Sequence, residues 1–127
     1  LLASAGLKRL GMMDTRVAIP VEMLLPAPGQ GALGIECRTD DTRTQSVLST
    51  VNNAITYSAV MAERAFTRAL GATCHSPVAA LALLDDGELS MRAQLFSEDG
   101  REMVEEKAVF DCGDDRTPAK LAGDLLA

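Results

Sequence analysis

The thiol of Cys74 is the side chain of this sequence best placed to form a covalent bond. It lies in a short segment, residues 72–76, between a helix that ends at a glycine and a strand that begins at a proline. Rigid flanks make a loop thiol both accessible and fixed, as an attachment point for a covalent group requires. Most cysteines are structural, and a helix C-terminus disfavours the thiolate, so an inert thiol is the alternative interpretation.

The neighbours of Cys74 suggest neither a catalytic dyad nor a metal site. His75 is adjacent in the sequence, and adjacent side chains of an extended backbone point in different directions. The other two thiols, Cys37 and Cys112, lie far outside the spacing of two to four residues that structural zinc sites use. We expect Cys37 to be buried in an apolar strand and Cys112 to lie at the surface. Three cysteines without short-range pairing favour a reducing, cytoplasmic location.

Residues 29–34 match the pattern G-x-G-x-x-G of dinucleotide-binding proteins. That motif requires a strand before it and a helix after it, so that the pyrophosphate meets the helix N-terminus. Here Pro26 and Pro28 precede the glycines and an apolar, strand-like segment follows them. We therefore do not interpret the pattern as a nucleotide site.

Arginine dominates the basic residues, with nine of the twelve positions. Its planar fork is suited to binding carboxylates. Arg9 lies in the last turn of the first predicted helix, where it either compensates the charge of the helix C-terminus or binds a carboxylate ligand. We expect the cluster of Glu63, Arg64 and Arg68 to form a solvated or ion-paired helix face.

The first half of the chain is predicted to be interrupted by irregular structure. A helix ends at Gly11, after two basic residues, and residues 16–19 and 32–37 are predicted strands. Between these strands, residues 24–31 hold two prolines and two glycines, which is typical of a crossover or hinge between domains. Residues 39–42 offer N-cap side chains for a helix that continues to about Val51.

The second half has regular periodicity. Residues 55–70 are predicted to form a helix that ends at Gly71, with apolar side chains on one face at helical spacing. These are Ile55, Ala59, Ala62, Phe66, Ala69 and Leu70. Three strands follow, over 77–84, 88–96 and about 101–110, with a hairpin turn at residues 85–87. Thr117 as the N-cap and Pro118 at the first helical position predict the start of a last helix. Residues 53–127 are therefore predicted to form an α-β-β-β-α unit, an antiparallel meander covered by helices.

Composition excludes several functional classes. Hydrophobic residues make up 47% of the 127 residues, enough for a core, but aromatic residues only 3%, so stacking platforms for single-stranded nucleic acid are excluded. The net charge is −6, with −7 contributed by residues 81–127, which disfavours phosphate backbones. No apolar run approaches the roughly 20 residues that span a bilayer. The sequence starts without methionine and stops within a predicted helix, so we expect a fragment of a longer protein.

Four segments together resemble the porphobilinogen deaminase (hydroxymethylbilane synthase) family. They occur in the order and with the spacing of that family's C-terminal portion, and the similarity covers essentially the whole chain. The segments are Ala5–Gly11, Leu25–Arg38, Ala62–Phe66 and Gly71–Pro77.

The resemblance implies a monomeric α/β enzyme of three domains. The first two are similar to periplasmic binding proteins, and the third is a smaller α+β domain. On this basis, residues 1–31 complete the second domain and form the hinge, residues 32–52 return to complete the first domain, and residues 53–127 form the third domain with the cofactor loop.

The resemblance also implies a chemistry and assigns residues to it. The family is a transferase of tetrapyrrole (haem) biosynthesis that joins four porphobilinogen molecules, with loss of ammonia, into hydroxymethylbilane. The chain grows on a dipyrromethane cofactor linked by a thioether to a cysteine, at the position of Cys74. Arg9 matches a residue that binds the carboxylates of cofactor and substrate, and Gln30 matches a cleft position near the cofactor. The catalytic aspartate lies outside this sequence, so the fragment alone is predicted to be inactive, and Thr73 replaces a glycine common in the family's loop.

A competing hypothesis is a non-catalytic α+β binding or regulatory module without covalent chemistry. The self-contained unit of residues 53–127 supports it, whereas the ordered similarity over residues 1–52 speaks against it.

Overall fold

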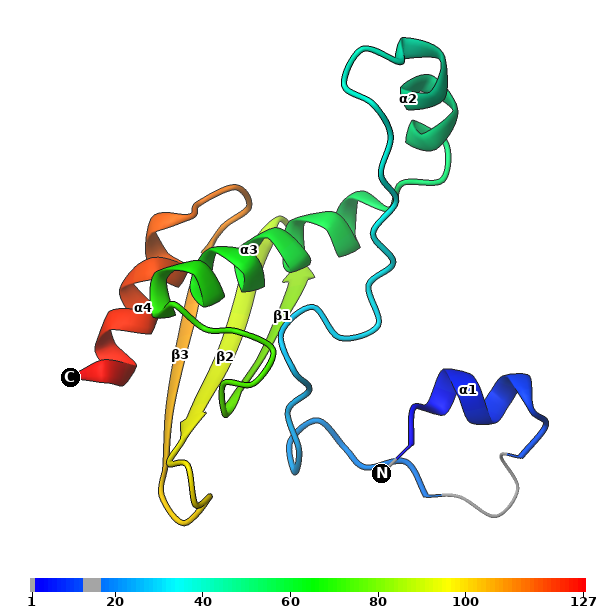
Figure 1. Cartoon of the computed structure of the whole chain (residues 1–127). Coiled ribbons are helices and arrows are strands. Elements are labelled where there is room, and N and C mark those ends of the chain that lie inside the picture. The colour runs from blue at the N-terminus through cyan, green and yellow to red at the C-terminus, as the bar shows by residue number, and fades with distance from the viewer. Residues whose placement is uncertain (1, 13–16) are drawn as a thin grey trace.

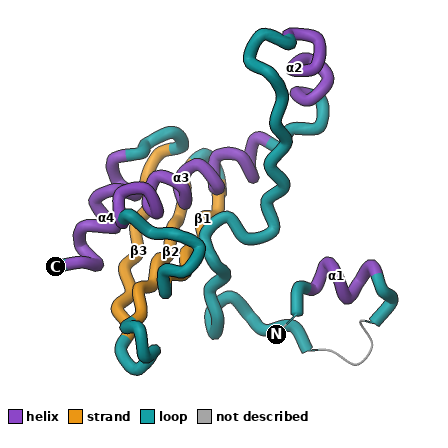
Figure 2. Tube along the Cα trace, viewed as in Figure 1, coloured by secondary structure: helices purple, strands orange, loops and turns teal. Residues whose placement is uncertain are grey.

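The computed structural model describes residues 2–12 and 17–127, and it divides into a layered α+β unit and a more open N-terminal part (Figure 1). The N-terminal part carries two short helices that stand apart from the sheet. The C-terminal unit consists of a sheet and two helices (Figure 2). The elements are α1 (Ser4–Arg9), α2 (Thr42–Ser49), α3 (Ala54–Leu70), β1 (Val78–Asp85), β2 (Glu88–Phe96), β3 (Met103–Asp111) and α4 (Arg116–Leu126).

The sheet is an antiparallel meander with strand order β1-β2-β3, as the alternating pattern predicts. Asp86 and Gly87 both have positive φ, 46° and 88°, which is the geometry of a tight hairpin turn between β1 and β2. The third strand begins two residues later than predicted. The preceding turn is closed by the Ser97 N–H, which donates to the Glu102 carbonyl at 3.0 Å, so Arg101 belongs to the turn.

Helices α3 and α4 cover one face of this sheet and build the core with it. Phe66 on α3 is fully buried, and Leu89 and Met91 on β2 are each 1% exposed. The opposite face is polar in its centre, where Arg92 and Gln94 of β2 both donate to Glu105 of β3. The α-β-β-β-α organisation predicted for residues 53–127 is confirmed. Ile55 and Ala69, predicted on the apolar face of α3, are exposed. Further residues of the core cluster are Ala62, Ala80, Ala82, Ala93, Phe110, Leu121, Ala122 and Leu125.

Most helix ends agree with the sequence signals, but the predicted N-cap of α4 is wrong. Asp41 caps α2 by accepting from Thr44 N–H at 3.0 Å, and Gly71 ends α3 with φ 67°. Thr117 is not the N-cap of α4, because the helix begins at Arg116. Instead, the carboxylate of Asp114 accepts from the backbone N–H and the hydroxyl of Thr117, so the two carboxylate oxygens of an aspartate satisfy both donors.

The two strands predicted in the N-terminal part are wrong. Residues 17–19 and 32–37 are not strands, and Arg16 of the first prediction lies outside the described residues. Leu33 is 92% and Ile35 is 63% exposed. An apolar run becomes a strand only where another strand pairs with it, and the described residues offer no such neighbour to either segment.

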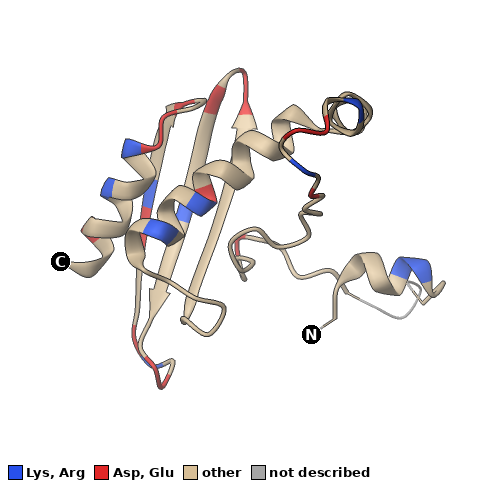
Figure 3. Cartoon of the chain, turned by 45° about the horizontal axis from the view of Figure 1, so that its top comes forward, with Lys and Arg blue, Asp and Glu red and all other residues tan. Residues whose placement is uncertain are grey.

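Acidic residues concentrate at the two turns of the sheet (Figure 3). Asp85 and Asp86 lie at the β1–β2 turn, and Glu98 and Asp99 at the β2–β3 turn, which the antiparallel topology places at opposite ends. The C-terminal unit therefore presents negative charge at both ends of its sheet. No helix within the described residues is long and apolar enough to cross a membrane.

Candidate functional site

The Cys74 loop is a turn between α3 and β1 whose backbone is held by hydrogen bonds. The Ala72 N–H donates to the Thr67 carbonyl at 2.9 Å, which ties the loop to the last turn of the helix. The Thr73 N–H donates to Oγ of Ser76 at 2.9 Å, and the Ser76 N–H donates back to the Thr73 carbonyl at 3.0 Å. Cys74 between them is exposed. The loop therefore presents its thiol to solvent on a backbone closed by its own hydrogen bonds.

Threonine at position 73 is compatible with this loop. Among the described residues, Asp86 is the only non-glycine residue with positive φ, so Thr73 adopts ordinary backbone geometry. Its hydroxyl also accepts from the His75 N–H at 3.3 Å. Thr73 therefore adds a hydrogen bond to the turn without straining its backbone.

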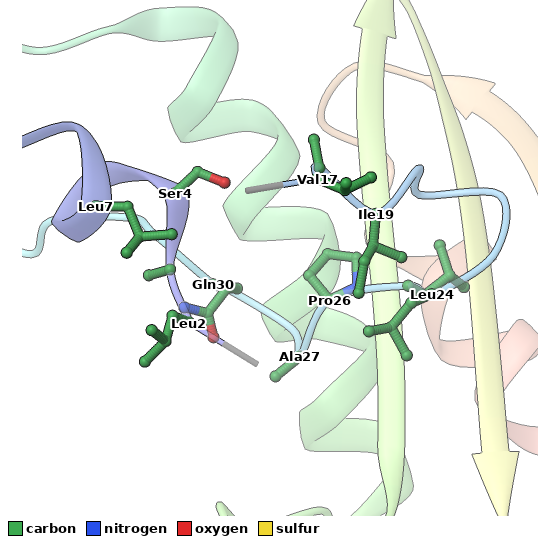
Figure 4. Close-up of a pocket in the computed structure, with 12 residues that line it drawn as sticks. Leu2, Ser4, Leu7, Val17, Ile19, Leu24, Pro26, Ala27 and Gln30 are labelled. Carbon is green, nitrogen blue, oxygen red and sulfur yellow. The ribbon is translucent and has the colours of Figure 1, made fainter. Parts of the chain in front are cut away.

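Arg9 and Gln30 lie on separate parts of the N-terminal segment. Arg9 is exposed in the last turn of α1, as predicted, and makes no ion pair with any described residue. Gln30 lies in a turn flanked by Gly29 and Gly31, which have φ values of 72° and 80°. Its side chain lines a hollow of about 640 Å³ together with Leu7 of α1 (Figure 4). Neither Arg9 nor Cys74 lines this hollow.

A second hollow, of about 860 Å³, runs between residues 28–37, the end of α2 and the N-terminal half of α3. Its wall includes Ile35 and Tyr57, which are 63% and 58% exposed. Cys37 also lines it and is exposed, so the prediction that Cys37 is buried is wrong. The burial failed to occur because the strand expected to carry Cys37 does not form. The prediction that Cys112 lies at the surface is confirmed.

Glu63 is the functional candidate that the sequence interpretation missed. It is only 5% exposed and forms no ion pair with a described residue, so the solvated or ion-paired face predicted for it is wrong. Its carboxylate accepts from the Ala82 N–H at 2.8 Å and from the Gly29 N–H at 2.5 Å. Burial raises the pKa of Glu63, and the two N–H donors oppose this rise. The helical spacing of Ala59, Glu63, Phe66 and Leu70 placed it on the apolar stripe, which was the available signal.

A second carboxylate, Glu105, has the opposite electrostatic environment. It accepts from Gln94 Nε2 at 2.5 Å, from Lys107 Nζ at 3.1 Å and from Arg92 Nη2 at 3.0 Å. The hydrogen bond from Gln94, with those from Lys107 and Arg92, lowers the pKa of Glu105 to about 2. This cluster joins β2 to β3 on the sheet face opposite the helices and lines neither of the two hollows.

The predicted site residues are not assembled into one pocket by the described residues. Cys74 follows α3, Arg9 ends α1 and Gln30 lies in the turn between the two glycines. No hydrogen bond joins any two of the three in the part of the chain that the structure describes. Their common role stays a prediction. Of the three, Cys74 is the one whose exposed side chain lies on a loop closed by its own hydrogen bonds.

Fold and site together define a class of protein. It is an α+β domain with a three-stranded antiparallel sheet and an exposed cysteine on a hydrogen-bonded loop. A crossover (residues 24–31) with two prolines and two glycines connects it to an N-terminal segment, none of whose described residues belongs to the core cluster. Comparison of the sequence with models of known protein families identifies the family within this class. A model described as "Porphobilinogen deaminase, C-terminal domain" matches residues 57–127, and one described as "Porphobilinogen deaminase, dipyromethane cofactor binding domain" matches residues 1–46. The chain belongs to the porphobilinogen deaminase family.

A curated relative agrees with this assignment. The porphobilinogen deaminase of Sphingopyxis alaskensis is 52% identical over 105 residues, which cover 82% of this chain. The same alignment covers 33% of the relative, so the chain spans about a third of that protein's length.

Proposed function

We propose that this chain is the C-terminal part of an enzyme that joins four porphobilinogen molecules into hydroxymethylbilane with loss of ammonia. Cys74 carries a dipyrromethane cofactor through a thioether, and the enzyme is a transferase of tetrapyrrole biosynthesis. Membership of the family and the name of the model matching residues 1–46 support the cofactor. The observation that carries the proposal is the exposed Cys74 thiol on a hydrogen-bonded loop.

The residues present fit a covalently bound pair of pyrrole rings. An exposed sulfur leaves room for the rings beside the loop, whereas a sulfur enclosed by side chains would exclude them. Loss of ammonia from the aminomethyl group of porphobilinogen leaves an electrophilic methylene carbon. The Cys74 thiol would give up its proton to solvent, and the resulting soft thiolate would form a C–S bond with this carbon in place of the broken bond to the ammonia nitrogen. When bound, the dipyrromethane supplies the nucleophilic pyrrole on which the product chain grows.

Arg9 and Gln30 supply the polar contacts that this chain contributes to the cleft. The rings of substrate and cofactor bear carboxylates, which a guanidinium binds as a pair of parallel hydrogen bonds. Arg9 is exposed and free of carboxylate partners among the described residues, so it is available for such a ligand. Gln30 is exposed on the glycine turn and supplies an amide to the cofactor or its surroundings.

We propose that the whole enzyme has three domains, and that this chain contributes to each of them. Residues 1–31 complete a second domain and the hinge, residues 32–52 complete a first domain, and residues 53–127 form the third. The enzyme is a cytoplasmic monomer, and its catalytic aspartate lies outside this sequence. The chain of 127 residues is therefore expected to be inactive by itself.

The intact mass of the full-length enzyme tests this proposal. It should exceed the polypeptide mass by one dipyrromethane, and Cys74→Ser should abolish the increment and the activity. Cys112→Ser, which changes another exposed thiol, should keep both. An unmodified Cys74→Ser enzyme with full activity would refute the proposal.

The self-contained core of residues 53–127 favours one alternative, a binding or regulatory module without covalent chemistry. Ehrlich's reagent separates the two functions, because it colours a protein-bound dipyrromethane and leaves a bare module colourless.

A further inference from the structure

The carboxylate of Glu63 joins three parts of the chain that are distant in sequence. Glu63 itself lies on α3, the Ala82 N–H donor lies on β1, and the Gly29 N–H donor lies in the crossover. Each carboxylate oxygen accepts one of the two hydrogen bonds, Oε1 from Ala82 and Oε2 from Gly29. A single buried side chain therefore links helix, sheet and crossover.

Backbone N–H groups at the unpaired edge of β1 donate hydrogen bonds to Glu63 and to the crossover. Within the described part of the chain, β1 pairs only with β2, so its other side carries backbone N–H groups that the sheet leaves free. The Ala80 N–H donates to the carbonyl of Pro26 at 3.0 Å, and the Ala82 N–H donates to Glu63. The crossover thus lies along the edge of β1, with Leu25 buried to 5% exposure beside it.

A carboxylate satisfies both donors at this position. An ionised carboxylate offers acceptors on both oxygens and no donor, which matches two converging N–H groups. No lysine or arginine among the described residues forms an ion pair with Glu63, so the backbone donors are its observed partners. A buried charge held by two N–H groups is costly to leave half satisfied, because each orphaned group loses its hydrogen bond without regaining water.

We infer that Glu63 is a positioning residue that clamps the crossover turn, and with it Gln30, against the strand and helix that flank the Cys74 loop. Gly29, whose N–H is held, immediately precedes Gln30. Both flanks of the loop are held as well, since α3 carries the carboxylate and β1 carries Ala82. The clamp itself is independent of the chemistry at Cys74, and its effect on turnover rests on the proposed function.

Amide hydrogen exchange tests the clamp directly. The wild-type Gly29 and Ala82 amides should exchange slowly, whereas the amide of the exposed Leu33 should exchange fast. In Glu63→Gln the side-chain amide presents one acceptor and one donor, so one N–H group loses its partner. Exchange at Gly29 or Ala82 should then rise about tenfold or more, the change expected from losing one buried hydrogen bond. Met91, in the core strand β2, should change less than about twofold.

A control variant and the exchange rates of the wild-type protein provide two further tests of the clamp. Glu98→Gln makes the same chemical change in an exposed turn and should leave the exchange at Gly29 and Ala82 unchanged. Exchange of the wild-type Gly29 amide as fast as that of Leu33 would overturn the clamp without any variant having to fold. Unchanged exchange at both amides in Glu63→Gln would overturn it as well.

Turnover of the full-length enzyme tests the positioning role. Glu63→Gln should keep the dipyrromethane mass increment and lower kcat about tenfold, with KM within about twofold of wild type, because binding groups remain but the cleft is misaligned. A wild-type kcat in this variant would contradict positioning. A missing mass increment in the wild-type enzyme would instead contradict the proposed function, and the exchange result at Gly29 would stand separately.

Discussion

The C-terminal unit and the N-terminal part use similar apolar residues in different ways. In the C-terminal unit, Phe66, Leu89 and Met91 are each at most 1% exposed, because two helices close over one face of the sheet. In the N-terminal part, Val17 and Leu33 are each 92% exposed. Composition is therefore a poor guide to burial here. What differs is whether the chain itself supplies a second layer to cover the apolar face.

Dividing the chain at residue 52 should give the largest effect that this comparison predicts. A chain of residues 53–127 holds the complete core cluster and should show a cooperative thermal transition by circular dichroism. Residues 1–52 alone should show none, because α1 and α2 are short and bury little apolar area. A C-terminal piece without a transition would contradict the view that the unit is self-contained.

Truncation of the core comes next in size. Phe66→Ala removes a fully buried ring from the junction of α3 and the sheet, and it should lower the free energy of unfolding by about 3–5 kcal/mol. Ile55→Ala on the same helix is the control, since Ile55 is 60% exposed. It should change the free energy by no more than about 0.5 kcal/mol in urea titrations. Similar losses of unfolding free energy for both variants would show that α3 does not have one buried and one exposed face.

Two glycines of the C-terminal unit should respond in opposite directions to the same change. Gly71→Ala places a Cβ at φ 67° at the end of α3 and should destabilise the unit by about 1–2 kcal/mol. Gly123→Ala in α4 has no such strain and open space around it, so it should stabilise by about 0.5–1 kcal/mol. If the melting temperatures of both variants shifted in the same direction, the positive φ of Gly71, just before the Cys74 loop, would not explain the effect.

The smallest predicted effect concerns the polar face of the sheet. The folded pKa of Glu105, about 2, lies below its ordinary value of 4.5, so the cluster contributes stability above about pH 4.5. That contribution should disappear as the pH falls from about 4.5 towards 2, because protonation removes the charge that Gln94, Lys107 and Arg92 stabilise. Wild type and Glu105→Gln should therefore differ in urea midpoint at pH 6 and converge near pH 2.

Gln94→Ala refines the same measurement. Loss of the Gln94 amide removes the leading cause of the lowered pKa of Glu105, so the stability lost on acidification should be smaller than in wild type. An equal acid sensitivity in wild type, Glu105→Gln and Gln94→Ala would exclude the cluster as its source.

The contrast between the two regions also explains what could be predicted from the sequence. In residues 53–127 the signals are local: Gly71 ends a helix, Asp86–Gly87 forms a turn, and polar and apolar residues alternate over residues 88–95. Whether residues 32–37 form a strand depends on a partner strand, which no local pattern encodes. For Glu63, charge favoured exposure while helical position favoured burial, and two backbone donors from distant segments decided the outcome.

The candidate site was predictable to a similar degree. The accessible loop thiol followed from residues on either side of Cys74, and the structure confirms its exposure. The relation of Cys74 to Arg9 and Gln30 involves segments far apart in sequence, and the described residues join none of them directly. Likewise, the clamp at Glu63 required coordinates, because the sequence does not show that Gly29 and β1 meet.

The covalent state of the Cys74 sulfur tests the central claim most directly. Trypsin cleavage after Arg68 and Arg92 of the full-length enzyme releases residues 69–92, a peptide in which Cys74 is the only cysteine. Tandem mass spectrometry of this peptide should find one dipyrromethane on Cys74. An unmodified Cys74 in enzyme that turns over porphobilinogen would contradict the account.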